Sequence, residues 1–110
     1  MNEEPLMKTT QFAKKVYEVL MSVPSGRVVT YGDVARVLGN SCYARAVGNA
    51  LHHNSKKGEI PCHRVVNGKG ELATHFAFGG LKGQQCMLES EGVWVENGRV
   101  DLNKFQYKGL

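Results

Sequence analysis

Apolar side chains recur at helical spacing near the start of the chain, with lysine and glutamate between them. The apolar positions are Phe12, Val16, Val19, Leu20 and Val23. Because this spacing places them on one face, the pattern predicts an amphipathic helix from about Thr10 to Val23. Pro24-Ser25-Gly26 then predicts a turn that ends the helix, and Arg27-Val28-Val29 predicts a short extended segment.

A second helix is predicted from Thr30, whose hydroxyl suits an N-cap. Asp33, three residues on, can close a capping box with a shorter arm than the usual glutamate. The buried side of this helix is predicted to hold three apolar residues, Val34, Val37 and Leu38. Gly39-Asn40 tolerates a left-handed backbone and predicts the end of the helix.

A third helix is predicted after Ser41, which offers another hydroxyl cap. Its apolar stripe is Val47, Ala50 and Leu51. Two short helices joined by a tight turn are typical of a helix-turn-helix. The first turns of the third helix present small residues around one cation, namely Arg45 among Ala44, Ala46 and Gly48. Such a surface permits close approach to a partner, although small residues serve helix packing equally well.

The middle of the chain predicts turns and short strands. Ile60 to Val66 lacks helical periodicity, and Pro61 argues against a central strand there. We expect an extended or turning segment before Val65-Val66. Asn67-Gly68-Lys69-Gly70 predicts a tight turn, and Ala73 to Gly80 predicts an aromatic, glycine-bounded loop that packs on the body of the domain.

The remainder of the chain predicts one helix and one hairpin. The helix is expected from about Leu81 to Ser90, closed by Gly92. Asn97-Gly98 is a strong hairpin signal between Val93 and Leu102. Residues 103–110 form a polar tail with scattered aromatics that is expected to lie over the surface. The predicted fold class is therefore mainly α with short β pieces.

Composition bounds the architecture and the location. A chain of 110 residues with 42% apolar and 22% charged residues is expected to fold as one domain over residues 1–110. No apolar run approaches the roughly 20 residues that span a bilayer, and the acidic start differs from a signal peptide. Three cysteines without a CxxC pair fit reduced thiols, so a soluble, cytoplasmic protein is expected.

The charge distribution favours a polyanionic partner. The formal net charge is +4, and the surplus lies in residues 1–70, which hold ten basic and five acidic side chains. A surplus of this kind suits nucleic acid, although many solvated surfaces share it.

The stretch IPCHRVV places Cys62 beside His63 and Arg64. Imidazole and guanidinium groups can stabilise a thiolate, which makes a cysteine nucleophilic. Neighbours in an extended chain point to opposite faces, however, so the local pattern favours a buried structural cysteine. His52 and His53 lie nearby in the sequence, but no CxxC or HxxxH spacing supports a metal site.

Glu91 is a candidate third member of the site. A carboxylate can orient a histidine, fix its tautomer and stabilise its charged form. The local sequence by itself favours a solvated acid at the end of a helix. Glycine-rich phosphate cradles of known spacing are absent from the sequence.

Several motifs together resemble the O6-alkylguanine-DNA alkyltransferase family. In chain order they are TYGDVARVLG, ARAVGNAL, Asn54, IPCHRVV, GG and ESEG, which cover roughly residues 10 to 92. The resemblance implies a winged-helix-like helix-turn-helix domain that carries both the DNA-binding surface and the active site. The amino-terminal domain of many members is absent from this chain, so neither its zinc site nor any cofactor is expected.

The resemblance also implies a chemistry, the single transfer of an alkyl group from O6 of guanine in DNA to Cys62. His63 corresponds to the histidine that takes the thiol proton through a water, and Glu91 to the acid that holds this histidine. Asn54 corresponds to the asparagine that braces the turn carrying the cysteine. Displacement at an alkyl carbon needs a thiolate, and this relay supplies one.

The same resemblance implies how DNA is bound. Arg45 corresponds to the arginine that fills the space of the extruded nucleotide, and Tyr31 to the tyrosine that crowds the neighbouring phosphate. Flipping is needed because a stacked base hides its O6 atom from a thiol. In this family the second helix of the motif lies in the minor groove, where the small residues Ala44, Ala46 and Gly48 permit close approach. The expected substrate pocket comprises Tyr31, Val65, Phe78 and Gly79, with the backbone carbonyl of Val65 reading the guanine edge.

Two departures from the family pattern keep a second interpretation open. Residues 75–80, the expected aromatic wall, form a longer segment that lacks the usual tyrosine. The short chain resembles the alkyltransferase-like proteins, which bind O6-alkylguanine and flag it for another pathway. Those proteins usually carry tryptophan or alanine where Cys62 stands, so the cysteine favours transfer.

The expected partner is double-stranded DNA containing O6-alkylguanine, bound by a monomer. Lesion binding without transfer is the alternative, and a sequence-specific helix-turn-helix regulator is a third hypothesis.

Overall fold

The computed structural model describes residues 9–53 and 59–110. Its elements are α1 (Thr9–Leu20), β1 (Val29–Thr30), α2 (Tyr31–Val37), α3 (Ala44–His52), β2 (Val65–Val66), α4 (Gly80–Ser90), β3 (Val95–Glu96), β4 (Arg99–Val100) and α5 (Leu102–Phe105). Two 3₁₀ turns, Ser41–Tyr43 and Cys62–Arg64, precede α3 and β2. The predicted class, mainly helical with short strands, is confirmed.

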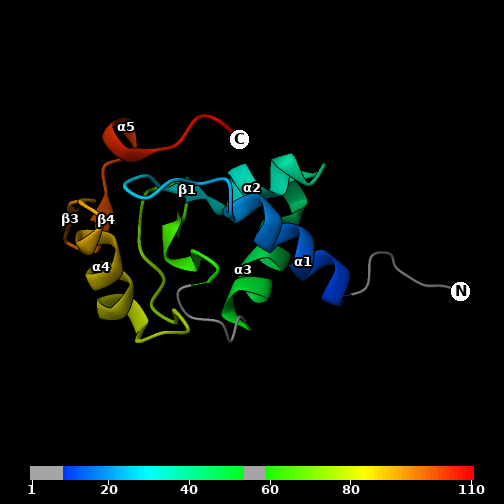
Figure 1. Ribbon diagram of the computed structural model, residues 1–110, viewed down its shortest axis with the longest axis horizontal. Helices are drawn as coiled ribbons and strands as arrows, with labels where there is room; N and C mark the ends of the chain where they lie inside the picture. The colour runs from blue at the N-terminus through cyan, green and yellow to red at the C-terminus, as the bar shows by residue number, and fades with distance from the viewer. Residues whose placement is uncertain (1–8, 54–58) are drawn as a thin grey trace, which may run out of the picture.

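A short parallel strand pair stands between two groups of helices. Helices α1, α2 and α3 lie together at one end, while α4 and the β3–β4 hairpin lie at the other (Figure 1). Strand β1 pairs with β2, so that Val29 lies opposite Val65 and Thr30 opposite Val66. No helix within the described ranges is long and apolar enough to cross a membrane.

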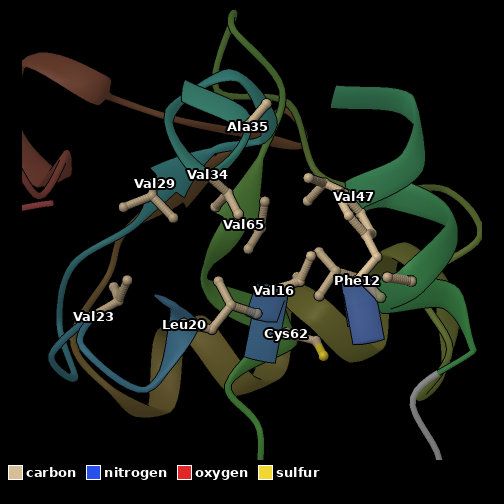
Figure 2. Close-up of a cluster of buried hydrophobic side chains, with 12 residues drawn as sticks. Phe12, Val16, Leu20, Val23, Val29, Val34, Ala35, Val47, Cys62 and Val65 are labelled. Atoms are coloured by element: carbon tan, nitrogen blue, oxygen red, sulfur yellow. The ribbon is translucent and has the colours of Figure 1, made fainter. Parts of the chain in front are cut away.

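Each face of the β1–β2 pair covers a separate hydrophobic cluster. Val29 and Val65 belong to the cluster built on α1, α2 and α3, whereas Val28 and Val66 belong to the cluster of α4 and the hairpin. This follows because successive side chains of a strand point to opposite faces. Figure 2 shows the first cluster, in which Cys62 lies among apolar side chains of the helices and strands.

The capping box predicted at the start of α2 is present. The backbone N–H of Asp33 donates to the Thr30 hydroxyl, and the N–H of Thr30 donates to the Asp33 carboxylate, both at 3.0 Å. Val34 is buried as predicted, but the prediction for Val37 was wrong, because 45% of that side chain is exposed. Ala35 takes its place in the core, since the helix ends at Val37 and turns that residue away from α1 and α3.

Two other boundaries differ from the predictions. Helix α1 ends at Leu20, before Val23, and a turn continues to Pro24. The residue before a proline disfavours helical backbone, which accounts for the early end. The turn before α3 is capped by Asn40, whose side chain accepts from the N–H of Cys42, and not by Ser41. The predicted apolar stripe of α3, Val47, Ala50 and Leu51, is buried.

The carboxyl-terminal segment contributes more structure than its polarity indicated. The predicted hairpin is present, and Asn97 (φ 55°) and Gly98 (φ 73°) both adopt the left-handed backbone of its tight turn. Helix α5 was not predicted, although Asp101 caps it by accepting from the N–H of Asn103. After α5 the backbone bonds to both sides of Val28, which adds the tail to the edge of β1.

Candidate functional site

The 3₁₀ turn Cys62–Arg64, called here the cysteine turn, brings three consecutive side chains into one site. Pro61 precedes it, and the N–H of Arg64 donates to the Pro61 carbonyl at 3.0 Å. In an extended strand His63 and Arg64 would point to opposite faces, but in this tight turn both reach the same carboxylate. That carboxylate belongs to Glu91, the residue that follows α4.

Glu91 is held by two side chains of the cysteine turn. Arg64 donates from Nε to Oε1 at 3.0 Å and from Nη2 to Oε2 at 2.6 Å, a bidentate ion pair. His63 Nε2 lies 2.9 Å from Oε2 of the same carboxylate. Arg64 also donates from Nη1 to the carbonyl of Val23 at 2.8 Å, which ties the turn to the end of α1. Glu91 is therefore a structural partner of the turn and not a solvated acid.

The network keeps His63 neutral and Glu91 ionised. Burial lowers the pKa of His63 below its ordinary value, and the nearby Arg64 charge acts in the same direction, although Glu91 opposes both. Burial by itself raises the pKa of Glu91, but hydrogen bonds from Arg64 and His63 bring it below its ordinary value. With Nε2–H donating to an ionised Glu91, the buried Nδ1 of His63 is left as an acceptor. Among the described residues, nothing hydrogen-bonds this Nδ1 atom.

Cys62 belongs to the hydrophobic core and also borders a pocket. Its side chain is 4% exposed, so the structural interpretation of the sequence holds in part. The pocket has a volume of about 40 Å³, and we call it the cysteine pocket. Its lining comprises Tyr31, Gly48, Leu51, His52, Cys62, Val65, Ala73, His75, Phe76, Ala77 and Gln84.

Two of the residues predicted for the substrate pocket line it and two do not. Tyr31 and Val65 are present, whereas Phe78 and Gly79 are not among the lining residues. Phe76 occupies the wall instead, and Phe78 packs against it edge-on with ring centroids 5.7 Å apart. The loop turns at Gly79, so the aromatic ring nearest Cys62 comes from earlier in the segment.

Tyr31 is placed to act as a donor in this pocket. Burial raises the pKa of its hydroxyl, and negative charge at Cys62 raises it further. The phenol therefore stays protonated at neutral pH and can donate a hydrogen bond to a bound group.

Helix α3 divides its small residues between packing and an open surface. Ala44 packs against the core cluster, and Gly48 faces Tyr31, where an added Cβ would lie 3.9 Å from the ring. Arg45 and Ala46 are exposed. Within the part of the chain that the structure describes, Arg45 forms no hydrogen bond or ion pair, so its guanidinium is available to a ligand.

Sequence reasoning missed two connections in this site. It placed Arg64 near the thiol, whereas the structure pairs Arg64 with Glu91. It did not single out Gln84, which is fully buried on α4 and lines the cysteine pocket. A glutamine that falls on the buried stripe of an amphipathic helix, one turn before Leu88, was the available signal.

Other predicted features lie outside what the structure addresses or find no counterpart. Asn54 lies outside the described residues. Among the residues that are described, no group of three or more His, Cys, Asp or Glu side chains could hold a metal ion. His52 instead contacts the pocket loop, with Nδ1 3.1 Å from the carbonyl of His75.

A helix-turn-helix with an exposed arginine, set beside a pocket that contains a thiol and a His–Glu–Arg network, defines a DNA-binding domain with its own reactive site. The chain belongs to the 6-O-methylguanine DNA methyltransferase family, because the model of that family's DNA binding domain matches residues 11–93.

Relatives in this family include both transferases and proteins of another kind. The chain is 36% identical over 104 residues to Alkyltransferase-like protein 1 from Schizosaccharomyces pombe, covering 92% of this chain and 96% of that protein. It is 37% identical over 83 residues to the methylated-DNA–protein-cysteine methyltransferase of Methanosarcina acetivorans, covering 76% of this chain and 52% of that protein. It therefore spans about half the length of that methyltransferase.

The fold is similar to that of a solved DNA complex. The crystal structure of S. pombe Atl1 with damaged DNA containing O6-carboxymethylguanine superposes with a TM-score of 0.84 and 34% identity. The match covers 93% of this chain and 99% of that chain.

Proposed function

We propose that this protein binds double-stranded DNA containing O6-alkylguanine and accepts the alkyl group on Cys62. Helix α3 with Arg45 enters the minor groove, and the flipped base occupies the cysteine pocket beside Tyr31. The proposal draws on the family and on the relatives, one of which is named for transfer to a protein cysteine.

The observation that carries the transfer proposal is the neutral His63 next to Cys62, held by Glu91 and Arg64. A neutral imidazole with a free acceptor nitrogen can take the thiol proton through a water, which leaves a thiolate. The ionised Glu91 stabilises the imidazolium that forms. A salt-bridged partner beside the base avoids an isolated buried charge.

The group transfer itself needs no cofactor. The sulfur of Cys62 attacks the alkyl carbon, and a sulfur–carbon bond forms as the bond from that carbon to O6 breaks. The electron pair of the broken bond goes to guanine, which takes a proton to become an ordinary base. Tyr31 is placed to donate a hydrogen bond to the base as negative charge develops on it. The thioether is stable, so each molecule acts once.

Lesion binding without transfer is the second candidate. It is supported by the relative named Alkyltransferase-like protein 1 and by the confined position of Cys62. A pocket of about 40 Å³ holds only a few water molecules, so the loop of residues 73–80 must move before a purine enters. This candidate predicts tight, lesion-dependent binding in which the alkyl group stays on the DNA.

A comparison of the native protein with Cys62→Ser separates the two candidates. A duplex containing O6-methylguanine is incubated with each, and its nucleosides are analysed. Transfer predicts that the native protein converts the lesion to guanine with a yield limited by protein, whereas Cys62→Ser binds the duplex and leaves the lesion intact. Persistence of the lesion with both proteins would refute transfer, and the binding curves would then decide the second candidate.

A further inference from the structure

Gln84 is the largest polar side chain that the core of this protein buries completely. It lies on α4, its exposed fraction is 0%, and an apolar residue, Leu88, follows one turn later on the same buried face. Burial of an amide is unfavourable unless its hydrogen bonds are made. A leucine would serve packing at this position at lower cost, so the amide points to a role beyond filling space.

The amide of Gln84 joins the segment around the cysteine turn to the pocket loop. Nε2 donates to the carbonyl of His63 at 3.1 Å and to the carbonyl of Val65 at 2.9 Å. Oε1 accepts from the N–H of Ala73 at 2.7 Å. One side chain thus fixes two carbonyls beside the catalytic pair and the first residue of the loop that ends in α4.

These bonds act on the lining of the cysteine pocket. Val65, Ala73 and Gln84 all border it. A carbonyl oxygen has two lone pairs, and Gln84 occupies one of those on Val65. The other can accept from a donor in the pocket. The exocyclic 2-amino group of guanine, which O6 alkylation leaves unchanged, is such a donor.

We propose that Gln84 is a positioning residue that orients the Val65 carbonyl toward the 2-amino group of the flipped base and so makes the pocket selective for guanine lesions. The inference rests on the proposed binding of O6-alkylguanine. It predicts that Gln84 governs discrimination between bases more than the overall stability of the complex.

The test compares two duplexes that differ only by the 2-amino group, one with O6-methylguanine and one with O6-methylhypoxanthine. Binding is measured in the Cys62→Ser background so that the lesion is not consumed. We expect at least about tenfold preference for O6-methylguanine, the value of one well-placed hydrogen bond. Gln84→Met should reduce this preference to within about twofold of unity. Gln84→Lys, which can still donate to both carbonyls, should retain most of it.

Gln85→Met is the matched control, because its side chain bonds only Glu89 at the surface. The ratio of the two dissociation constants is the decisive readout, since a merely structural defect weakens both complexes alike. An unchanged ratio in a folded Gln84→Met variant would overturn the assignment, and if that variant does not fold, loss of the ratio in Gln84→Lys would do so. Equal binding of lesion and unmodified duplex by the Cys62→Ser background would overturn the proposed function itself, and the assignment with it.

Discussion

At the scale of single residues, the tight backbone of the cysteine turn converts sequence adjacency into contact. His63 and Arg64 meet on one carboxylate although they are neighbours, and Cys62 turns toward the core and the pocket. The sequence therefore contained all of the participants. The backbone conformation that determines who contacts whom depends on Pro61 and on the distant end of α4.

The rate of alkyl transfer should depend on the protonation of His63. Because the pKa of His63 lies below its ordinary value of 6.5, the rate should be constant at neutral pH and fall on acidification through a midpoint below 6.5. The Arg64 charge helps to lower that pKa, so Arg64→Met should move the midpoint to higher pH. Single-turnover rates measured from pH 4.5 to about 8 test this.

Arg99→Met provides the control for this profile. Arg99 also pairs with a glutamate, Glu71, but does so on the exposed hairpin. Its removal should leave the midpoint unchanged. Identical midpoints for Arg64→Met and the native protein would show that Arg64 does not tune the base.

The same two groups make the fold sensitive to acid. The folded pKa of His63 lies below 6.5, so the unfolded chain takes up the proton first and stability falls as the pH drops below 6.5. The folded pKa of Glu91 lies below 4.5, so its contribution is present above that pH and is lost as the pH falls through the folded value. Urea midpoints should decrease across both windows. In His63→Gln the decrease between pH 7 and 5 should be smaller, and an equal decrease would contradict this account.

At the scale of elements, local signals predicted what local interactions stabilise. The capping box of Thr30 and Asp33, the stripe of α3 and the turn at Asn97-Gly98 all depend on residues within a few positions of one another. The prediction failed where a distant partner decides. Val37 is exposed because of how α2 packs, and the tail is ordered because it bonds Val28 about 78 residues earlier along the chain.

The candidate site was predictable in its members but not in its wiring. Resemblance to a family supplied Cys62, His63, Glu91 and Tyr31, while the residues alone left a structural cysteine and a solvated acid in contention. The pocket wall could not be placed, because the path of the loop through Phe76 depends on long-range contacts with α3 and α4.

Loss of the cap at α2 should weaken the helix that carries Tyr31. Thr30→Ala removes an acceptor for a buried N–H, so the free energy of unfolding should fall by about 1–2 kcal/mol. Asp101→Ala is the matched control, because it removes a cap from the exposed, four-residue helix α5 and should cost about 0.5 kcal/mol. Chemical denaturation gives both values, and equal costs would contradict the central position assigned to α2.

Helix α3 should lose its ability to hold a flipped base when its cation is removed. Arg45→Ala should reduce lesion affinity about tenfold and reduce the fluorescence of a 2-aminopurine probe placed opposite the extruded nucleotide. Arg36→Ala, on the neighbouring helix α2 and 67% exposed, removes the same charge and should have a smaller effect. If both variants lose affinity equally, the arginine acts through general charge and not by occupying the base stack.

At the scale of the whole molecule, the β1–β2 pair joins two cores that hold different parts of the site. Cys62 belongs to the cluster of the first three helices, and Glu91 follows a helix anchored in the other cluster by Leu88. His63 and Arg64 connect the two. Relative movement of the two halves would therefore disturb the site before it exposed either core.

Gly70 tests the junction between the turn after β2 and the hairpin. Its φ of +82° is left-handed, and a Cβ there would overlap the carbonyl of Val100. Gly70→Ala should lower the free energy of unfolding by about 2–4 kcal/mol. Gly68→Ala in the same turn meets nothing within 4 Å and should be nearly neutral. Comparable stability of the two variants, measured by thermal unfolding, would contradict this packing.

The central claim is that Cys62 takes an alkyl group from DNA, and the mass of the protein tests it most directly. The native protein is incubated with an equimolar duplex containing O6-methylguanine, digested, and analysed by mass spectrometry. The account predicts that the peptide containing Cys62 gains one methyl group and that peptides with Cys42 and Cys86, both exposed, gain none. An unmodified Cys62 peptide recovered from a stable complex with the lesion would contradict it.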